Sequence, residues 1–165
     1  MTVYNKVTDQ DDLFGVCSRN LDLKDEDNNL YWEVAKKNNL PEILKGKNIA
    51  LQGELMGPGV QGNRESFKEH RFYIFDIWDI TEQRYYTPSE RDQFINVYGL
   101  YHVPVLEYLE LSFICNPDTI IDDLLKYAER KSINHEIAEG VVFKSLDGKY
   151  SFKIINNQFL LKEKD

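Results

Sequence analysis

The feature that most constrains the fold is a pair of apolar segments, NIALQGELMG at 48–57 and RFYIFDIWDI at 71–80. Both are rich in β-branched and aromatic residues, which favour strands with buried side chains. The segment GPGVQGN at 57–63 separates them, and a cluster of glycine and proline of this kind indicates a turn. The sequence therefore predicts two buried strands separated by this turn.

The segments on either side of this pair have the patterns of further strands and helices. Residues 28–40 have helical spacing, with Asn28 or Asn29 as the N-cap and Pro41 as the stop. Helices with a proline near the first helical position are expected at 88–100 and 117–133. Strands that flank the turns TDQDD and LDGK are expected at 1–5, 13–21, 140–145 and 150–161. The order β-β-α-β-β-α-β-α-β-β, without a repeat or a linker, predicts one α+β domain over residues 1–165.

Composition and charge narrow the class of protein. The chain has 165 residues, of which 42% are hydrophobic, and this is enough to bury a substantial core. The formal net charge of −8 gives a mean field that repels nucleic acid and anionic membranes alike. No apolar run approaches the roughly 20 residues of a membrane span, and no signal region is evident. Cys17 and Cys115 lie in unrelated contexts and are expected to be buried free thiols. We expect a cytoplasmic protein, with neither a membrane nor a protein as partner.

Two glutamates lie in apolar surroundings. Glu54 is inside an apolar strand between Leu51 and Leu55, and Glu139 precedes Gly140 at the head of the apolar run in AEGVVFKS. A carboxylate on the buried face of a strand must be hydrogen-bonded, paired or metal-bound, because desolvating it alone costs too much free energy. For Glu139 the alternative is a solvated glutamate at a strand end. Two such glutamates on separate strands indicate a site.

Phe75 and Asp76 are neighbours in the second apolar segment, so they are expected on opposite faces of one strand. In one interpretation Phe75 is a core residue and Asp76 faces solvent. In the other, Phe75 stacks on a base and Asp76 makes a polar contact to the same ligand. The glycines at 57–63 match neither common nucleotide-binding glycine motif, so a β-turn is favoured over a phosphate loop.

Basic residues provide candidate anion ligands. Lys153 and Lys162 have apolar neighbours in SFKIINNQFLLKEK, and Lys144 lies on the neighbouring strand. Lysines on strands commonly only increase solubility, but lysines in an apolar context also suit a buried anion such as a triphosphate. Arg19 in SRN could hold a phosphate or merely flank a strand. The histidines have no spacing that indicates a metal site or a catalytic triad, and we assign them no role.

In order along the chain, SRN, GELMGPG, FYIFDIW, HVPVL, AEGVVFK and SFKIINNQFLLK resemble the nucleotidyltransferase domain of ATP-dependent RNA ligases, especially the branch called the fifth type. The resemblance covers almost the whole chain, and the ordered set is far more specific than any one motif. It implies an ATP-grasp-like α+β fold of antiparallel sheets flanked by helices. It also implies three steps: a lysine takes AMP from ATP, the AMP passes to an RNA 5′-phosphate, and an RNA 3′-hydroxyl displaces it to seal the ends.

The resemblance also implies roles for single residues. Glu54 would bind the ribose hydroxyls of ATP, and Phe75 would stack on the adenine. Glu139 would position Mg²⁺ or Mn²⁺, Lys153 would contact the α-phosphate, and Arg19 would contact phosphate or the RNA end. Positioned cations of this kind stabilise the negative charge that develops in phosphoryl-type transfer. The remaining candidates for polar contacts at the nucleotide are Asp76, Lys144 and Lys162.

The chain departs from the family pattern in two places. The family has its nucleophilic lysine in K-x-D-G, whereas the nearest match here, KSLDG at 144–148, is one residue too long and its Asp-Gly favours a hairpin turn. We therefore expect the N-terminus to lie inside the catalytic element, and the chain to bind ATP or AMP weakly and not to ligate. The last motif lacks its second lysine, for which Lys162 is the candidate substitute. The alternative is a non-catalytic, ligase-like module that binds nucleotide or RNA ends.

Overall fold

The two apolar segments form the longest strands of the protein, β4 (Ile49–Met56) and β5 (Arg71–Asp79), and they pair in antiparallel fashion. The computed structural model describes residues 1–162, which form two compact units. Unit 1 comprises residues 1–63 and 67–103, and unit 2 comprises residues 64–66 with the chain from Pro104 onward. This division does not test the expectation of one nucleotidyltransferase domain, which stays a prediction.

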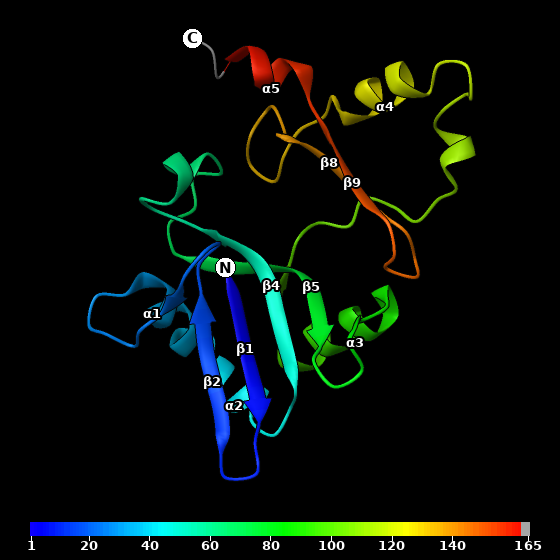
Figure 1. Cartoon of the computed structure of the whole chain (residues 1–165). Coiled ribbons are helices and arrows are strands. Elements are labelled where there is room, and N and C mark those ends of the chain that lie inside the picture. The colour runs from blue at the N-terminus through cyan, green and yellow to red at the C-terminus, as the bar shows by residue number, and fades with distance from the viewer. Residues whose placement is uncertain (163–165) are drawn as a thin grey trace. The chain divides into compact units, whose positions relative to one another are not determined.

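Unit 1 contains a seven-stranded sheet with β4 and β5 near its middle (Figure 1). The strand order is β3-β2-β1-β4-β5-β6, and the short strand β7 pairs with β5 as its only parallel neighbour. The expected N-terminal hairpin is confirmed as β1 and β2, which pair from Thr2–Cys17 to Val7–Asp12. The other bounds are β1 Thr2–Val7, β2 Asp12–Cys17, β3 Asp22–Leu23, β6 Arg84–Tyr85 and β7 Tyr101–His102.

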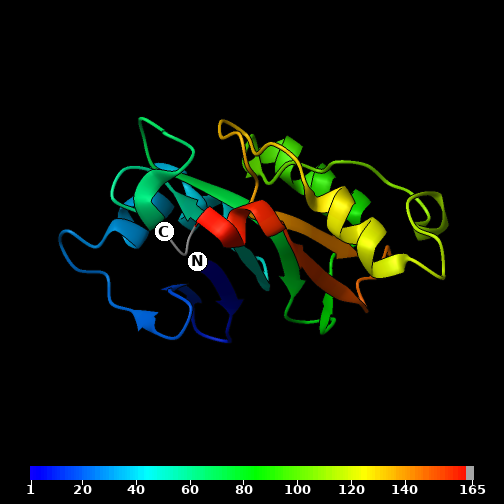
Figure 2. The same cartoon turned by 90° about the horizontal axis from the view of Figure 1, so that it is seen from above.

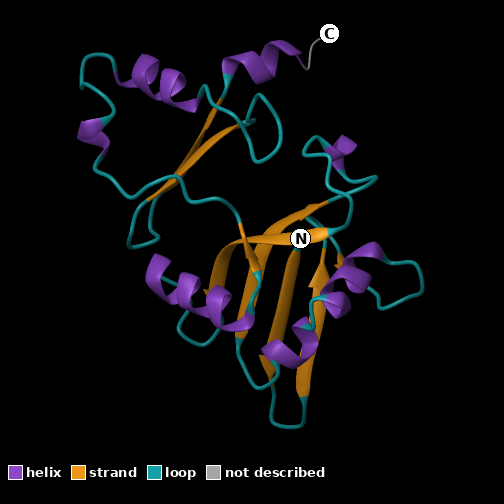
Figure 3. Ribbon diagram, turned by 180° about the vertical axis from the view of Figure 1, so that it is seen from behind, coloured by secondary structure: helices purple, strands orange, loops and turns teal. Residues whose placement is uncertain are grey.

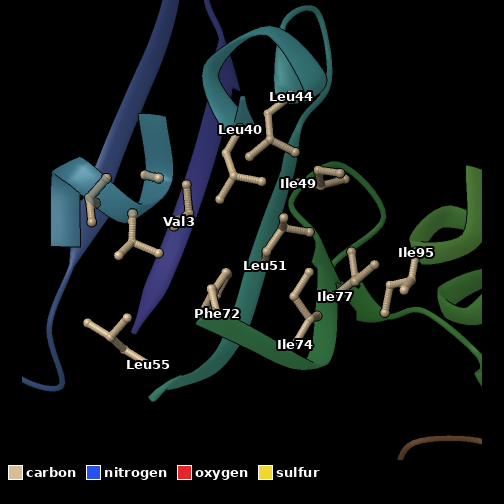
Figure 4. Close-up of a cluster of buried hydrophobic side chains, with 13 residues drawn as sticks. Val3, Leu40, Leu44, Ile49, Leu51, Leu55, Phe72, Ile74, Ile77 and Ile95 are labelled. Carbon is tan, nitrogen blue, oxygen red and sulfur yellow. The ribbon is translucent and has the colours of Figure 1, made fainter. Parts of the chain in front are cut away.

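The helices α1, α2 and α3 lie on one face of this sheet, as the view from behind shows (Figure 3). Their bounds are α1 Leu30–Lys37, α2 Leu40–Leu44 and α3 Pro88–Tyr98. Apolar side chains from the helices and the strands meet between the two layers (Figure 4). The members of this core are Val3, Val16, Val34, Ala35, Leu40, Leu44, Ile49, Leu51, Leu55, Phe72, Ile74, Ile77 and Ile95. The core therefore covers one face of the sheet, and the side chains of the opposite face are available for other contacts.

The expected helix at 28–40 is two helices, and Pro41 does not stop it. Asn29 caps α1 by accepting a hydrogen bond from the Tyr31 N–H at 3.2 Å. Asn39 then adopts a left-handed conformation with φ of 55°, and Pro41 lies in the first turn of α2. Proline is tolerated there because the first N–H groups of a helix have no intrahelical partner. Proline therefore begins the next helix at this position.

The third helix of unit 1 follows its sequence signals closely. Thr87 and Glu90 form a capping box, in which each side chain accepts a hydrogen bond from the other's backbone N–H. Arg84 donates two hydrogen bonds of 2.8 Å to the Glu90 carboxylate. The helix begins at Pro88, as predicted, and ends at Gly99, which has a left-handed φ of 63°.

Unit 2 contains a β-hairpin with a helix along it. Helix α4 (Ile120–Ala128) lies beside the strands β8 (Gly140–Lys144) and β9 (Ser151–Ile155) in two views (Figures 1 and 2). The Tyr127 ring lies 5.7 Å from the Phe143 ring, which stacks on Phe152 at 4.9 Å. A short 3₁₀ helix, η2 (Leu111–Phe113), precedes α4. None of the helices within residues 1–162 has the length and apolar character needed to cross a membrane.

Two expectations for unit 2 are wrong at their boundaries. Helix α4 begins at Ile120, after the cap residue Thr119, so Pro117 lies before the helix and not at its first position. The strand expected at 150–161 ends at Ile155, and α5 (Asn157–Lys162) replaces its second half. The reason is Asn156, which is only 1% exposed and whose side chain accepts from the Gln158 N–H at 2.9 Å. This contact starts a helix.

We expect Leu51→Ala to lower the free energy of unfolding by about 2–5 kcal/mol, because it leaves a cavity among fully buried neighbours. Leu13→Ala is the matched control, since Leu13 is 53% exposed and its loss should change stability by no more than about 0.5 kcal/mol. Urea unfolding followed by tryptophan fluorescence measures both values. Equal losses for the two variants would contradict the core described above.

The start of α3 should also respond to pH. The hydrogen bonds from Arg84, and then that from the Thr87 backbone, lower the pKa of Glu90 from 4.5 to about 2. Because the folded-state pKa is depressed, Glu90 stabilises the fold above about pH 4.5, and this stabilisation is lost as the pH falls towards about 2. Glu90→Gln should therefore lower the melting temperature at neutral pH, and its difference from the wild type should shrink on acidification. A difference in melting temperature between Glu90→Gln and the wild type that stays constant with pH would refute the stabilising role of the Glu90 carboxylate.

Candidate functional site

A β-bulge in β5 decides where Phe75 and Asp76 lie. The pairing of β4 with β5 shifts register at Gly53, which leaves Phe75 as an extra residue on β5. Ile74 and Ile77 are both in the core, at 0% and 1% exposure, although residues three apart in a regular strand face opposite sides. The two residues between them therefore both lie on the face away from the core. The expectation that Phe75 and Asp76 face opposite sides is wrong, because the bulge resets the alternation.

Glu54 lies on the same face of the sheet. It pairs with Tyr73, and its neighbour Leu55 points into the core. Asp76 pairs with Gln52, which is two residues from Glu54 and hence on the same side of β4. The Glu54 side chain is exposed, so the interpretation of a carboxylate on the buried face is wrong. Glu54, Phe75 and Asp76 are thus brought together on the face that the helices leave uncovered.

Gly53 permits the backbone arrangement at the bulge. A Cβ atom at this position would fall well inside van der Waals contact with the Tyr73 carbonyl oxygen and the Phe72 ring. The Met1 ammonium group donates to the Gly53 carbonyl at 2.9 Å. Burial lowers the pKa of this ammonium group, and the Glu54 carboxylate offsets part of that shift. The absence of a side chain at Gly53 therefore lets the two strands approach at the point where their register shifts.

The structure places Arg19 in an exposed turn directly after β2. The turn is closed by a backbone hydrogen bond of 2.9 Å from Ser18 to Leu21. Cys17 and Cys115 are free thiols, as expected, but both are only partly buried. Partial burial, followed by a hydrogen bond to Asp22, raises the pKa of Cys17. Arg19 is therefore a surface cation at the end of a strand.

In unit 2 the structure brings Glu139 and Lys153 into direct contact. The Lys153 ammonium forms an ion pair with the Glu139 carboxylate across the start of the hairpin. The Lys153 side chain is 40% exposed and the Glu139 side chain 53%. Lys153 therefore does not line a buried anion site. The Glu139 carbonyl accepts a hydrogen bond of 2.9 Å from the Asn156 N–H, which fixes the backbone beneath the pair.

Lys144 shares a face of the hairpin with Lys153. Lys153 pairs with Val142, and Lys144 is two residues further along β8 on the same side. The opposite face carries Phe143, which packs against α4. Lys162 instead lies exposed in the last turn of α5, because this segment is helical and not a strand. The hairpin thus presents two lysines and one glutamate on its exposed side.

The segment KSLDG forms a hairpin turn, as expected. The Asp147 carboxylate accepts hydrogen bonds from the Ser145 hydroxyl at 2.6 Å and from the Lys149 N–H at 3.1 Å. These bonds lower the pKa of Asp147 from 3.8 to about 2. Gly148 follows with a left-handed φ of 71°. The aspartate and glycine are therefore used to connect β8 with β9.

Glu139 is the candidate metal ligand. Within residues 1–162 no cluster of three or more His, Cys, Asp or Glu side chains could hold a metal ion. Mg²⁺ at phosphate-transfer sites is usually bound through one or two carboxylates together with substrate phosphates and water. The half-exposed oxygen donors of Glu139, beside a lysine, are compatible with a metal of this kind.

Sequence reasoning missed Glu65, which is 7% exposed and buried within unit 2. It accepts hydrogen bonds from Ser132 and from the Asn134 backbone. The local sequence GNRESF has no apolar flank that would indicate burial, and the donors lie far along the chain. No local pattern could have identified this residue.

Comparison with known proteins identifies the family of the chain. The model of the RNA ligase family matches residues 1–156, so the chain belongs to the RNA ligase family. No curated protein matches it. The family assignment and the α+β nucleotidyltransferase fold expected from the motifs are confirmed.

Solved structures of the Naegleria gruberi RNA ligase are similar to the chain. A variant with ATP and Mn has a TM-score of 0.88 and 41% identity, and a second with ATP and Mn has 0.86 and 42%. A third variant, with AMP and Mn, has 0.86 and 38%. Each match covers 99% of this chain and 48% of the other, so the chain spans about half the length of these structures.

We expect Gly53→Ala to destabilise unit 1 by about 1–3 kcal/mol, because the added methyl group overpacks the bulge. Gln52→Ala is the control, because it changes the residue next to Gly53 without adding an atom to the bulge. Thermal unfolding by circular dichroism measures the difference. Equal stability of Gly53→Ala and the wild type would show that the bulge does not require glycine.

Proposed function

We propose that this chain is the nucleotide-binding part of an ATP-dependent RNA ligase that joins RNA 5′-phosphate and 3′-hydroxyl ends. The observation that carries the proposal is the gathering of Glu54, Phe75 and Asp76 on one face of the sheet, in a chain that belongs to the RNA ligase family. The similar Naegleria gruberi structures contain ATP or AMP together with Mn. The proposed ligands are therefore ATP and a divalent metal, Mg²⁺ or Mn²⁺.

The residues of the sheet face are proposed to bind the nucleoside. The Phe75 ring, projecting from the bulge, provides an aromatic surface on which adenine stacks. The exposed Glu54 carboxylate accepts hydrogen bonds from the ribose hydroxyls, and charge-assisted bonds of this type are stronger than neutral ones. Asp76, beside Phe75, makes a further polar contact to the nucleoside. Each role uses a side chain on the face away from the core.

The residues of the hairpin are proposed to bind phosphates and the metal. Lys153 and Lys144, on one face of the hairpin, attract the α-phosphate and its neighbours. Glu139 holds the metal, and its ion pair keeps Lys153 beside that carboxylate. When bound, the metal neutralises the negative charge that develops on the transferring phosphate. Lys162 and Arg19 are proposed to contact phosphate and the RNA end, respectively.

The first chemical step of the proposed reaction requires a nucleophilic lysine. Lysyl-AMP forms when the lysine nitrogen attacks the α-phosphorus of ATP and pyrophosphate leaves. Lys144 does not match the family position for this nucleophile, because the Asp147 and Gly148 that follow it form a hairpin turn. We propose that residues 1–165 bind nucleotide without forming lysyl-AMP.

A non-catalytic module that binds nucleotide or RNA ends is the second candidate function, favoured by the absence of K-x-D-G from residues 1–165. Intact mass after incubation with ATP and Mn²⁺ tests the proposed lack of self-adenylylation. An unchanged mass agrees with it, whereas an added AMP mapped to a lysine would contradict it. The proposed setting is the cytoplasm.

Phe75→Ala should weaken ATP binding about 10-fold, because stacking of a base on an aromatic ring contributes about 1–3 kcal/mol. Isothermal titration calorimetry of ATP in the presence of Mn²⁺ measures the dissociation constant. Phe113→Ala is the matched control, since Phe113 is 79% exposed in unit 2 and its loss should leave ATP affinity unchanged. Equal affinities for wild type and Phe75→Ala would remove Phe75 from the site.

Glu139→Ala should abolish the increase in ATP affinity that Mn²⁺ provides, because the variant lacks the carboxylate proposed to hold the metal. Glu136→Ala is the control, because Glu136 lies three positions before Glu139 and is an exposed glutamate paired with Lys131. Calorimetric titrations with and without Mn²⁺ separate the two effects. A full Mn²⁺ effect in Glu139→Ala would refute the proposed metal role.

A further inference from the structure

We propose that Glu65 is a positioning residue for Glu139. It fixes the segment from Arg130 to Ala138, which leads directly into Glu139, and so determines where the metal-binding carboxylate stands. The inference rests on the metal role proposed for Glu139. All of these residues belong to unit 2.

The Glu65 side chain is anchored by two donors from one loop. Its carboxylate accepts a hydrogen bond from the Ser132 hydroxyl and another, of 2.6 Å, from the Asn134 N–H. The Asn134 side chain in turn donates to the Glu65 carbonyl at 3.1 Å. Glu65 is only 7% exposed, and a buried carboxylate is tolerated only when its oxygens have such partners. The loop cannot move away without exposing or unpairing this charge.

The segment between this anchor and Glu139 is closed by its own hydrogen bonds. The Ser132 N–H donates to the His135 carbonyl, and the Ala138 N–H donates to the Arg130 carbonyl, both at 2.8 Å. Ile137 and Ala138 are each 8% exposed, so the last residues before Glu139 are packed. A displacement of the loop at Ser132 would therefore be transmitted along a short, constrained path to Glu139.

Arg64 provides a second anchor on the same path. It donates to the Ile137 carbonyl at 3.4 Å, two residues before Glu139. Its guanidinium carbon lies 4.4 Å from the centre of the Phe159 ring, and Phe159 is itself buried at 8% exposure. Glu65 therefore holds the loop at Ser132 and Asn134, and Arg64 holds it at Ile137, just before the proposed metal ligand Glu139.

A variant at Glu65 distinguishes positioning from general stability. Glu65→Ala leaves the Asn134 N–H without its acceptor and frees the loop, so Mn²⁺ affinity in the presence of ATP should fall about 10-fold or more, as for other outer residues of metal sites. ATP affinity without metal should be unchanged. Glu65→Gln should restore Mn²⁺ affinity, because its amide oxygen can accept from the Asn134 N–H while its amide nitrogen donates to the Ser132 hydroxyl.

The experiment is a titration of Mn²⁺ into protein with saturating ATP, in which electron paramagnetic resonance measures free Mn²⁺. The wild type is compared with Glu65→Ala, Glu65→Gln and Glu139→Ala, each well below its melting temperature. Loss of affinity in Glu65→Ala and its recovery in Glu65→Gln support the inference. Unchanged affinity in Glu65→Ala overturns it. Loss of affinity in both Glu65 variants also overturns it, since the conservative change should keep the loop in place.

Two further outcomes are distinguishable. If Glu139→Ala binds Mn²⁺ like the wild type, the proposed metal role fails and this inference fails with it. If only Glu139→Ala loses affinity, the metal role stands and the inference alone is overturned.

If Glu65→Ala does not fold, Ser132→Ala removes a single donor and should still weaken Mn²⁺ binding about 3-fold, a smaller effect than loss of the carboxylate. Unchanged affinity in that variant would then overturn the inference.

Discussion

The register shift between β4 and β5 decides which side chains reach each face of the sheet. Without the extra residue at Phe75, Ile74 and Ile77 could not both enter the core, and one of them would replace a polar residue on the opposite face. The bulge therefore serves both the stability of the core and the proposed nucleotide binding. It keeps the apolar layer under the helices continuous while two adjacent residues, Phe75 and Asp76, project together from the other side.

The local arrangement of charged side chains matters more for the proposed phosphate binding than the net charge of the chain. The formal net charge is −8, which would disfavour a polyphosphate ligand if only the mean field mattered. The hairpin of unit 2 places Lys144 and Lys153 on one face, and Glu139 compensates part of this charge. An exposed ion pair of this kind contributes little to stability, so its place at a proposed metal site is better explained by binding than by folding.

Sequence reasoning predicted the strong local patterns and failed where a residue's surroundings come from elsewhere in the chain. The strands β4 and β5, the start of α3 at Pro88 and the family motifs all depend on residues within a few positions of one another. The bulge depends on how two strands pair, and the burial of Glu65 depends on a loop that begins more than sixty residues later.

Short helices were also misjudged, for the same reason. Helix α5 follows the buried Asn156, whose backbone N–H donates to the Glu139 carbonyl, and this contact is invisible in the sequence NNQFLLK. The apolar residues of that segment by themselves favour a strand, so the sequence predicts the wrong element there. A helix of this length is marginal by propensity alone and is stabilised by packing, here through Phe159.

The central claim is that the sheet face with the bulge binds the nucleoside of ATP. Mapping of backbone amide chemical shifts by NMR during titration with ATP and Mg²⁺ tests it most directly. The account predicts shifts at Gly53, Glu54, Phe75 and Asp76. Shifts confined to α3 or to residues 104–116, with these four residues unchanged, would contradict it.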